Sequence, residues 1–205
     1  SLKDISKKCA CVCITTDKVY KNVNKNHKAF KENDPLGGLD AYSASKAAVE
    51  ILVDSFRNSF CGHLEHQKDN LYIATARAGN AIGGGDWAED RLVPDIVRSV
   101  FKNEKLLVRN PLSVRPWQHV IDPLSGYLLL AECLYSGDLN CQTGFNFGPE
   151  EESSQTVSKL VHDFSDLWRG DWKFSNDLKD YYEADFLKLD VKKARDILSW
   201  KPRFC

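Results

Sequence analysis

Short apolar segments alternate with longer amphipathic segments along this chain, and that order restricts the possible fold more than any other feature. Residues 9–16 are apolar and end in β-branched side chains, as expected of a strand buried in a parallel sheet. Residues 42–60 repeat apolar side chains at helical spacing, and Asp40 precedes them as a helix N-cap. Because parallel strands need long crossovers between them, this order predicts an α/β fold with a parallel sheet.

The same alternation continues toward the C-terminal end. A polar loop occupies residues 21–39, a glycine-rich loop occupies residues 79–86, and Asp190 is placed to cap a last helix. The further strands are predicted at residues 71–77, 105–109, 145–148, 172–175 and 184–189, and the further helices at residues 92–102, 120–135, 156–168 and 191–199. We find no internal repeat and no low-complexity tract.

Charge and composition exclude several classes of function. A net charge of −1 over 205 residues offers no basic surface for nucleic acid or for an anionic membrane. No apolar run is long enough to cross a bilayer, and residues 1–8 lack the apolar core of a signal peptide. The seven cysteines are an odd number without the spacing of a disulfide framework, which favours reduced thiols and a cytoplasmic protein.

Three of these cysteines, Cys9, Cys11 and Cys13, alternate along the first predicted strand and so share one of its faces. A metal site on that face is conceivable. Small buried hydrophobic side chains are the better interpretation, because free cysteine is among the most buried residue types. Asp86 and Asp90 are also a weak metal signal without further ligands. We therefore expect no metal.

Tyr42 and Lys46 lie four residues apart, on one face of a predicted helix. A nearby ammonium favours the phenolate form and lowers the pKa of a tyrosine. Such a tyrosine can take the proton of a sugar hydroxyl while hydride leaves the same carbon. The pair alone is weak evidence, because a solvated surface pair has the same spacing.

A second polar group, Thr15-Thr16-Asp17-Lys18, follows the first predicted strand. In an open parallel sheet, ligands bind at the carboxyl ends of the strands. Thr16 can hydrogen-bond a sugar hydroxyl, Asp17 can supply a proton, and Lys18 can orient or deprotonate a group. The alternative is that these residues only begin a turn.

Longer strings around these residues resemble the CDP-glucose 4,6-dehydratases, a branch of the extended short-chain dehydrogenases. The matching strings occupy residues 32–46, 77–91, 109–111, 115–120, 123–127 and 145–149. The resemblance covers nearly the whole chain, and these strings discriminate far better than Tyr-x-x-x-Lys alone. It implies a partial Rossmann-like parallel sheet, from the C-terminal part of an NAD domain, with a small interleaved α/β substrate-binding region.

The resemblance also implies a division into domains. Residues 1–80 would be the C-terminal half of the NAD-binding domain, and residues 81–205 mainly the substrate-binding region, with residues 120–148 returning to the NAD domain. The Gly-x-x-Gly-x-x-Gly turn of such a domain is absent from the sequence. The chain also contains no methionine. We therefore expect a chain truncated at both ends, and weakly active or inactive alone.

The family mechanism assigns roles to the polar groups. Tyr42 would remove the O4 proton while C4 passes hydride to NAD, with Lys46 beside it. Water would then leave across C5 and C6, and hydride would return to C6 to give a 4-keto-6-deoxy sugar. Asp17 matches the acid that assists water loss. Lys18 stands where related dTDP-glucose enzymes carry a glutamate base, which leaves the identity of the C5 base open.

Further binding residues follow from the same resemblance. The residues expected at NAD are Thr15, Tyr42, Lys46, Ala78 and Asn80. The residues expected at the substrate are Thr16, Asn80, Arg91, Arg109 and Arg115. Guanidinium groups match phosphate oxygens, although an ordinary ion pair is the alternative for any single arginine. We interpret His119 as structural or pocket-lining, and not as a catalytic base.

Two other functions stay open. A sugar-nucleotide epimerase or reductase of the same superfamily would share Tyr42 and Lys46 but would not need an acid at Asp17. A non-catalytic fragment would act only in subunit association, through the helices at residues 42–60 and 92–102. For the full-length protein we expect CDP-glucose or a related nucleotide sugar as partner, a homo-oligomer (dimer or tetramer), and neither nucleic acid nor membrane.

Overall fold

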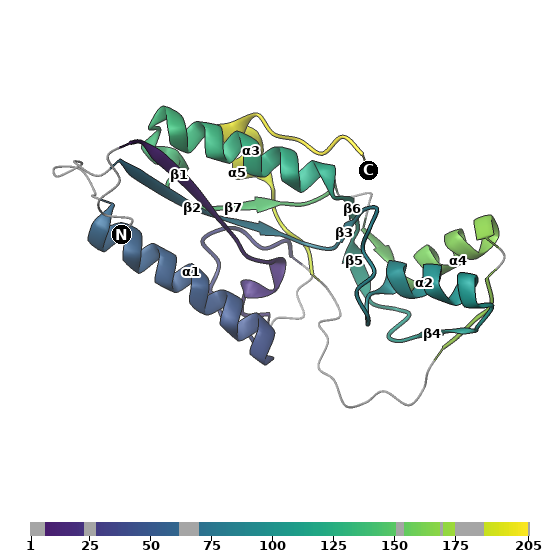
Figure 1. The fold of residues 1–205 in the computed structure, drawn as a ribbon. Helices are drawn as coiled ribbons and strands as arrows, with labels where there is room; N and C mark the ends of the chain where they lie inside the picture. The colour runs from purple at the N-terminus through teal and green to yellow at the C-terminus, as the bar shows by residue number, and fades with distance from the viewer. Residues whose placement is uncertain are drawn as a thin grey trace.

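The chain forms an α/β structure in which one parallel sheet is covered by helices on both faces. The computed structural model describes residues 7–22, 28–61, 70–150, 154–168, 170–174 and 187–204. Helix α1 lies on one face of the sheet, and helices α3 and α5 lie on the other, whereas α2 and α4 lie in a separate smaller part of the molecule (Figure 1). The predicted α/β class is therefore confirmed.

Three parallel strands form the main sheet in the order β1-β2-β7. The strands are β1 (Cys9–Ile14), β2 (Leu71–Ala78) and β7 (Gly144–Phe147), and the covering helices are α1 (Ala41–Phe60), α3 (Ile121–Ser136) and α5 (Lys192–Leu198). The register pairs Cys9 with Leu71 and Thr75 with Gly144. The carboxyl ends of β1 and β2 therefore lie side by side at one edge of the sheet.

The main core lies between this sheet and helices α3 and α5. Its fully buried side chains include Leu130 and Leu134 from α3 and Phe145 and Phe147 from β7. Trp200 packs edge-on against Phe147 and donates its indole N–H to the backbone oxygen of Asp122 at 3.1 Å. Burial of each such side chain contributes about 1.5–3 kcal/mol, so this layer holds the α3 side of the sheet together.

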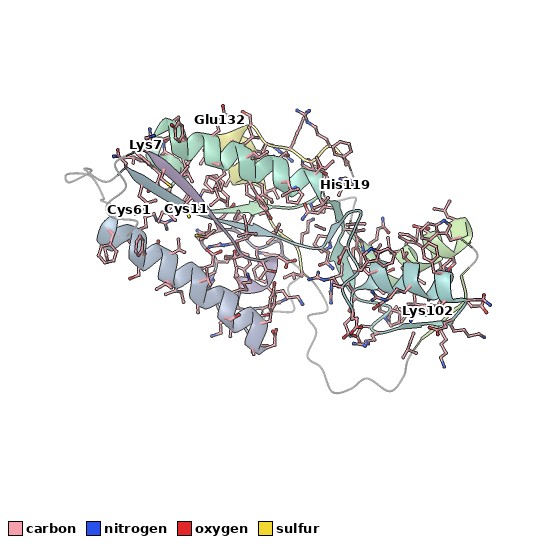
Figure 2. All side chains as sticks on the ribbon, in the orientation of Figure 1. Lys7, Cys11, Cys61, Lys102, His119 and Glu132 are labelled. Atoms are coloured by element: carbon pink, nitrogen blue, oxygen red, sulfur yellow. A yellow bond between two sulfur atoms is a disulfide. The ribbon has the colours of Figure 1, made fainter. Side chains whose placement is uncertain are left out.

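Helix α1 begins at Ala41, one residue before the predicted start, and Asp40 caps it as predicted. The Asp40 carboxylate accepts the backbone N–H of Ser43 at 2.9 Å and its hydroxyl at 2.5 Å. The helix packs against the face of β1 that carries Cys9, Cys11 and Cys13, which are half-buried. Figure 2 shows Cys11 on this side of the sheet and Cys61 at the end of α1.

The smaller part of the molecule, called the small lobe here, consists of α2, α4 and two pairs of short strands. Its elements are α2 (Leu92–Lys102), β4 (Leu106–Val108), β5 (Val114–Pro116), β8 (Ser154–Thr156), α4 (Val157–Trp168) and β9 (Trp172–Phe174). β4 pairs with β9 in parallel, and β5 pairs with β8 antiparallel. Ile96, Val108 and Val161 are buried in its own core. A further parallel pair, β3 (Ala81–Ile82) with β6 (Gln118–His119), lies between the small lobe and the main sheet (Figure 1).

Several expectations need correction. The first strand ends at Ile14 and not at residue 16, because Thr16 is the N-cap of the 3-10 turn η2 (Asp17–Val19). Asp190 accepts the N–H of Lys192, as expected of a capping side chain, but the helix begins only at Lys192. The strand predicted at residues 184–189 lies partly outside the described residues, and its last residue, Leu189, makes only an isolated bridge with Phe30.

The cysteines differ from the expectation that all thiols are reduced. Cys133, near the end of α3, forms a disulfide with Cys141, which ends the 3-10 turn η3 (Leu139–Cys141). Among the described cysteines, Cys9, Cys11, Cys13 and Cys61 are not disulfide-bonded. In the described part of the chain, no helix is both long and apolar enough to span a membrane.

Candidate active site

The candidate site lies where the main sheet presents the carboxyl ends of β1 and β2. Thr15 follows β1 and donates its backbone N–H to the oxygen of Ala76 in β2 at 2.8 Å. Gly79 and Asn80 follow β2, so the two predicted polar segments meet at one edge of the sheet. The structure therefore brings Thr16 and Asp17 next to Gly79, as expected if polar residues gather where parallel strands present their carboxyl ends.

Asp17 is the most unusual side chain of this edge. It is only 2% exposed, and one carboxylate oxygen accepts the hydroxyl of Thr16 at 3.0 Å. The other oxygen has no hydrogen-bond partner among the described residues, and a Cβ added at Gly79 would lie 2.8 Å from it. Burial raises the pKa of Asp17 to about 6, against the opposing hydrogen bond of Thr16 and the charges of Lys18 and Arg115. A carboxyl group of this kind can hold a proton near neutral pH and donate it.

Tyr42 and Lys46 stand on the first turns of α1, which packs against η2. Tyr42 is 53% exposed and Lys46 is half-buried. The pKa of Asp40, at the N-terminus of the same helix, is lowered mainly by its hydrogen bonds with Ser43 and additionally by the charge of Lys18. Lys18 therefore lies within electrostatic reach of the end of α1 that carries Tyr42.

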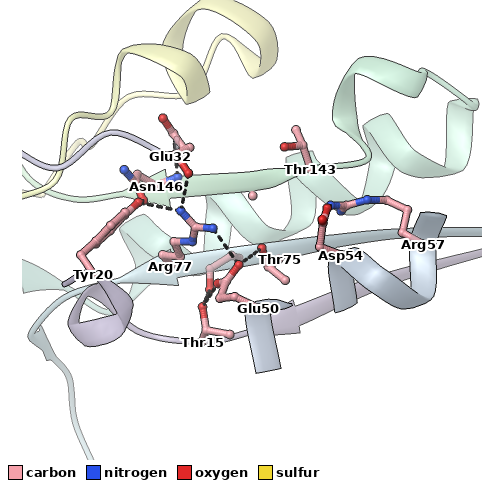
Figure 3. Close-up of polar contacts among 12 residues, drawn as sticks. Thr15, Tyr20, Glu32, Glu50, Asp54, Arg57, Thr75, Arg77, Thr143 and Asn146 are labelled. Atoms are coloured by element: carbon pink, nitrogen blue, oxygen red, sulfur yellow. Dashed lines mark hydrogen bonds and ion pairs between the residues drawn. The ribbon is translucent and has the colours of Figure 1, made fainter. Parts of the chain in front are cut away.

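A buried polar network lies beneath this site, and no local pattern in the sequence indicates it (Figure 3). Glu50, two turns after Tyr42, is 4% exposed. Its carboxylate accepts the hydroxyl groups of Thr15 at 2.5 Å and Thr75 at 2.6 Å, and pairs with Arg77 at 2.8 Å. Burial pushes the pKa of Glu50 upward, but the hydrogen bonds and charge of Arg77 outweigh it, and the pKa is lowered. Glu50 therefore stays ionised and fixes α1 against β1 and β2.

The network continues on the other side of Arg77. The guanidinium donates to the Tyr20 hydroxyl at 2.8 Å and to the backbone oxygen of Glu32 at 3.0 Å. Tyr20 in turn donates its hydroxyl to the side-chain oxygen of Asn146 at 2.6 Å. Asn146, in β7, is fully buried and donates its amide to the backbone oxygen of Phe30 at 2.9 Å. These bonds connect the predicted loop at residues 21–39 to strands β2 and β7 of the sheet.

The three predicted arginines occupy different surroundings. Arg115 is 4% exposed, and its charge acts on Asp17, so the structure places it near the site. Arg109 is exposed and pairs with Asp90 at 2.6 Å. Arg91 is exposed at the N-terminus of α2. Of the three arginines, only Arg115 lies within electrostatic reach of Asp17. Arg109 makes an ordinary ion pair, which was the alternative to phosphate binding for any single arginine.

The remaining predicted residues lie at or beside the strand ends. Ala78 ends β2 and is half-buried, and the backbone oxygen of Asn80 accepts the N–H of Gln118 at 3.1 Å. His119 accepts the backbone N–H of Ile121 at 3.2 Å and packs against Phe204, and Figure 2 places it between the main sheet and the small lobe. These contacts support a structural role for His119.

Gln118 is a residue that sequence reasoning missed. It is 2% exposed, and neither polar atom of its side-chain amide has a hydrogen-bond partner within the described residues. A buried polar group without a partner costs about 1–3 kcal/mol, so such groups usually serve a ligand or water. The one available signal was its position between Arg115 and the predicted helix at residues 120–135, in a string that resembles the family.

The chain is similar to known sugar-nucleotide 4,6-dehydratases over nearly its whole length. A family model described as GDP-mannose 4,6 dehydratase matches residues 2–205. The chain is 43% identical over 205 residues to the CDP-glucose 4,6-dehydratase of Salmonella typhimurium, covering 100% of this chain and 57% of that protein. It is 27% identical over 194 residues to a dTDP-glucose 4,6-dehydratase of Streptomyces antibioticus, covering 94% and 52%.

Solved structures show the same fold. The dTDP-glucose 4,6-dehydratase of Bacillus anthracis, crystallised with NAD, matches with a TM-score of 0.76 and 22% identity, covering 94% of this chain and 56% of that one. The chain spans little more than half the length of the curated relatives it matches. The family match over residues 2–205 shows that the chain belongs to the GDP-mannose 4,6 dehydratase family.

Proposed function

We propose that this chain is the substrate-side half of an NAD-dependent nucleotide-sugar 4,6-dehydratase that acts on CDP-glucose. The observation that carries the proposal is Asp17, a buried carboxyl group with one unpaired oxygen among the described residues and a pKa raised to about 6 by burial. Loss of water from a sugar needs an acid that protonates the departing hydroxyl. An epimerase or reductase oxidises and reduces a single carbon, and it therefore needs no such acid.

Each polar group then has a role in the reaction. Tyr42 takes the proton of the C4 hydroxyl, with Lys46 one turn further along α1 beside it. Bound NAD would supply the acceptor for the C4 hydride and the donor of hydride to C6. Thr16 binds a sugar hydroxyl, and Asp17 gives its proton to the C6 hydroxyl, which leaves as water. The products are a 4-keto-6-deoxy sugar nucleotide and one water molecule. Lys18 is a candidate for the base that removes the C5 proton and gives it back to C5 when hydride adds to C6.

The residues present fit the reactive end of NAD. Tyr42 and Lys46 are accessible on α1, and Ala78 and Asn80 stand at the end of the neighbouring strand. Thr15 uses its hydroxyl on Glu50, so we assign it to support of the site. The glycine-rich turn that binds the pyrophosphate is absent from the sequence, and we propose that these 205 residues alone are weakly active or inactive.

The substrate assignment rests on the arginines and on the relatives. We propose that Arg115 binds the diphosphate together with Asn80, and that Arg91 and Arg109 contact the nucleotide from the small lobe. The 43% identity to the Salmonella CDP-glucose 4,6-dehydratase supports CDP-glucose over other nucleotide sugars. We also propose the domain division at residue 80, with residues 120–148 returning to the NAD domain. We propose a cytoplasmic location as well, because four of the described cysteines are not disulfide-bonded and only Cys133 and Cys141 are.

The decisive experiment uses the full-length protein with NAD and CDP-glucose. We expect a product with the absorbance of a 4-keto sugar in alkali, and much less product from dTDP- or GDP-glucose. Product from dTDP- or GDP-glucose but none from CDP-glucose would contradict the substrate assignment.

Two variants separate the steps. Tyr42→Phe should lower turnover by about 10²–10⁴-fold without NADH appearing, because oxidation itself fails. Asp17→Asn should still oxidise C4, so NADH should accumulate, as measured by its absorbance, while the final product is lost. Asp54→Asn, at an exposed carboxylate of α1, serves as the control and should turn over normally. An Asp17→Asn variant with full turnover would favour an epimerase or reductase.

Subunit association is the second candidate function, favoured by the exposed apolar face of α1. Ile51 is 59% exposed and Leu52 is 68% exposed on this helix. We propose a homo-oligomer, a dimer or tetramer, in which α1 contributes to the interface. Calorimetric titration of this chain with NAD, combined with sedimentation, tests this function: self-association without NAD binding supports a fragment that acts only in assembly.

A further inference from the structure

Cys133, Asp138 and Cys141 bring three potential metal ligands together at the C-terminal end of α3. One ligand atom from each residue lies within 4.8 Å of the others. Cys141 is fully buried, Cys133 is half-buried and Asp138 is exposed, so the group is open to solvent on the carboxylate side. In this structure the two sulfurs form a disulfide. The cluster lies outside the candidate active site and has no role in the proposed mechanism.

Hydrogen bonds hold the carboxylate in place. One oxygen of Asp138 accepts both the backbone N–H of Asn140 at 2.9 Å and its side-chain amide at 3.0 Å. The other oxygen lies 3.9 Å from the sulfur of Cys133. Bonds of this kind to a ligand orient it and strengthen metal binding. The backbone is also restrained, because Asp138 donates its N–H to the oxygen of Cys133 and Cys141 donates to that of Asp138.

The surroundings favour a cation. Two thiolates and a carboxylate would place three negative charges at the C-terminus of a 16-residue helix, the end that already carries a partial negative charge. A divalent ion would leave the site with one excess negative charge. The ammonium of Lys8 lies against Gly137, within the loop between the ligands, and supplies the compensating positive charge.

We propose that the reduced form of this cluster binds Zn²⁺ through Cys133, Cys141 and Asp138, with water as the fourth ligand. Zinc prefers a tetrahedral set of thiolate and carboxylate ligands, whose mutual separations are about 3.3–3.8 Å. The Asp138 carboxylate already lies 3.9 Å from the sulfur of Cys133, whereas the two sulfurs must move apart from their bonded separation after reduction. Two thiolates also favour zinc over Mg²⁺ and Ca²⁺.

The site exists only after reduction. A dithiol reductant gives two electrons and two protons to the disulfide and becomes a disulfide itself. Zn²⁺ then displaces the two thiol protons as it binds the sulfurs. The same three residues would thus hold either a disulfide or a metal, according to the redox state.

The test measures Zn²⁺ binding to the full chain by calorimetry, and Co²⁺ binding by the thiolate-to-cobalt absorption band, in reduced and in disulfide form. We expect one tightly bound ion in the reduced protein, lost in Cys133→Ser and in Cys141→Ser. Asp138→Asn and Asn140→Ala alter exposed side chains, and each should weaken binding about tenfold or more without unfolding the protein. Cys11→Ser is the matched control, because Cys11 and Cys13 form the other close pair of described thiols.

Two results would overturn the proposal. One is equal affinity of the disulfide and reduced forms for Zn²⁺. The other is a cobalt band that persists in Cys133→Ser and Cys141→Ser but disappears in Cys11→Ser, which would move the binding to β1. Neither result depends on the dehydratase activity, so this test and the test of the proposed function fail independently.

Discussion

Glu50 and Asp17 are two buried carboxyl groups at the same end of the sheet, yet their surroundings are opposite. Glu50 is surrounded by two hydroxyl donors and a guanidinium, and its pKa is lowered despite burial. Asp17 receives one hydroxyl, keeps one oxygen unpaired among the described residues, and has its pKa raised to about 6 by burial. A buried carboxylate whose oxygens all have hydrogen-bond partners stabilises the fold. A buried carboxyl group with an unpaired oxygen can still hydrogen-bond a substrate.

The same contrast separates two buried amides. Asn146 uses its side chain to accept from Tyr20 and to donate to Phe30 and Asp190. Gln118 has no described partner for either polar atom of its amide. Glu50 and Asn146, whose side-chain bonds are made, surround Arg77 beneath the strand ends, and only the Nε of Arg77 lacks a described partner there. The unpaired groups of Asp17 and Gln118 instead lie in the segments that follow β1 and β5. Function and stability are thus assigned to different polar residues, and substitutions can separate them.

The largest loss of stability should follow from removing a buried side chain whose hydrogen bonds are all made. Glu50→Ala leaves Arg77 buried without its counter-charge, and we expect the free energy of unfolding to fall by about 3–5 kcal/mol. Urea denaturation of the two proteins measures this. Asp54→Ala, which breaks an ion pair with a 60% exposed aspartate on the same helix, should cost less than about 1 kcal/mol. Equal effects of the two changes would show that the network carries no special stability.

Asp17→Asn should raise the free energy of unfolding, and the size of this gain should depend on pH. The pKa of Asp17 rises from 3.8 to about 6 on folding, so both states are protonated below pH 3.8. Between pH 3.8 and about 6 the unfolded state ionises while the folded state keeps its proton, so the free energy of unfolding falls by about 3 kcal/mol and then changes little above pH 6. The asparagine of the variant cannot ionise, so the variant should gain about 3 kcal/mol over the native protein between about pH 4 and pH 7. Urea denaturation at both pH values decides, and a constant difference would refute the raised pKa.

Gln118→Leu should stabilise the ligand-free chain by about 1–3 kcal/mol, because it removes two polar atoms that lack a described partner, at similar volume. Asn146→Leu is the matched control and should destabilise, since it breaks three side-chain hydrogen bonds. Thermal unfolding of both variants gives the sign. A destabilised Gln118→Leu variant would mean that the amide has a structural partner and would weaken the contrast.

Arg109→Ala should have the smallest effect on stability. Its ion pair with Asp90 joins side chains that are 51% and 70% exposed, so we expect a loss below about 1 kcal/mol. If Arg109 binds the nucleotide, the KM of the full-length enzyme for CDP-glucose should rise while kcat changes little. An unchanged KM would confine Arg109 to its ion pair with Asp90.

The features predicted correctly are local or follow from one topological rule. Helix α2 lies at residues 92–102, where the sequence predicts it, because its apolar spacing spans three turns. Asp17 is identifiable because parallel strands present their carboxyl ends at one edge. The short strands β3, β5, β6 and β8 are missed, since two or three residues are too few to show a periodicity.

The features missed depend on residues far apart in the chain. Glu50 meets Arg77 across 27 positions, and Tyr20 meets Asn146 across 126. Nothing local marks these partners, because a glutamate at helical spacing is ordinarily a solvated side chain. The disulfide between Cys133 and Cys141 is missed for a related reason: a separation of 8 residues has no characteristic spacing, and only the turn after α3 brings the sulfurs together.

The parallel order β1-β2-β7 also has a consequence for how the chain folds. Its strands come from residues 9–14, 71–78 and 144–147, so each pairing closes a long loop before any ladder forms. Loop closure of this kind gives a high contact order and slow folding. Until β7 has been synthesised, β2 has no strand to pair with along one of its two edges, and its apolar residues there have no partner. We therefore expect nascent chains to depend on chaperones and low temperature for good yield.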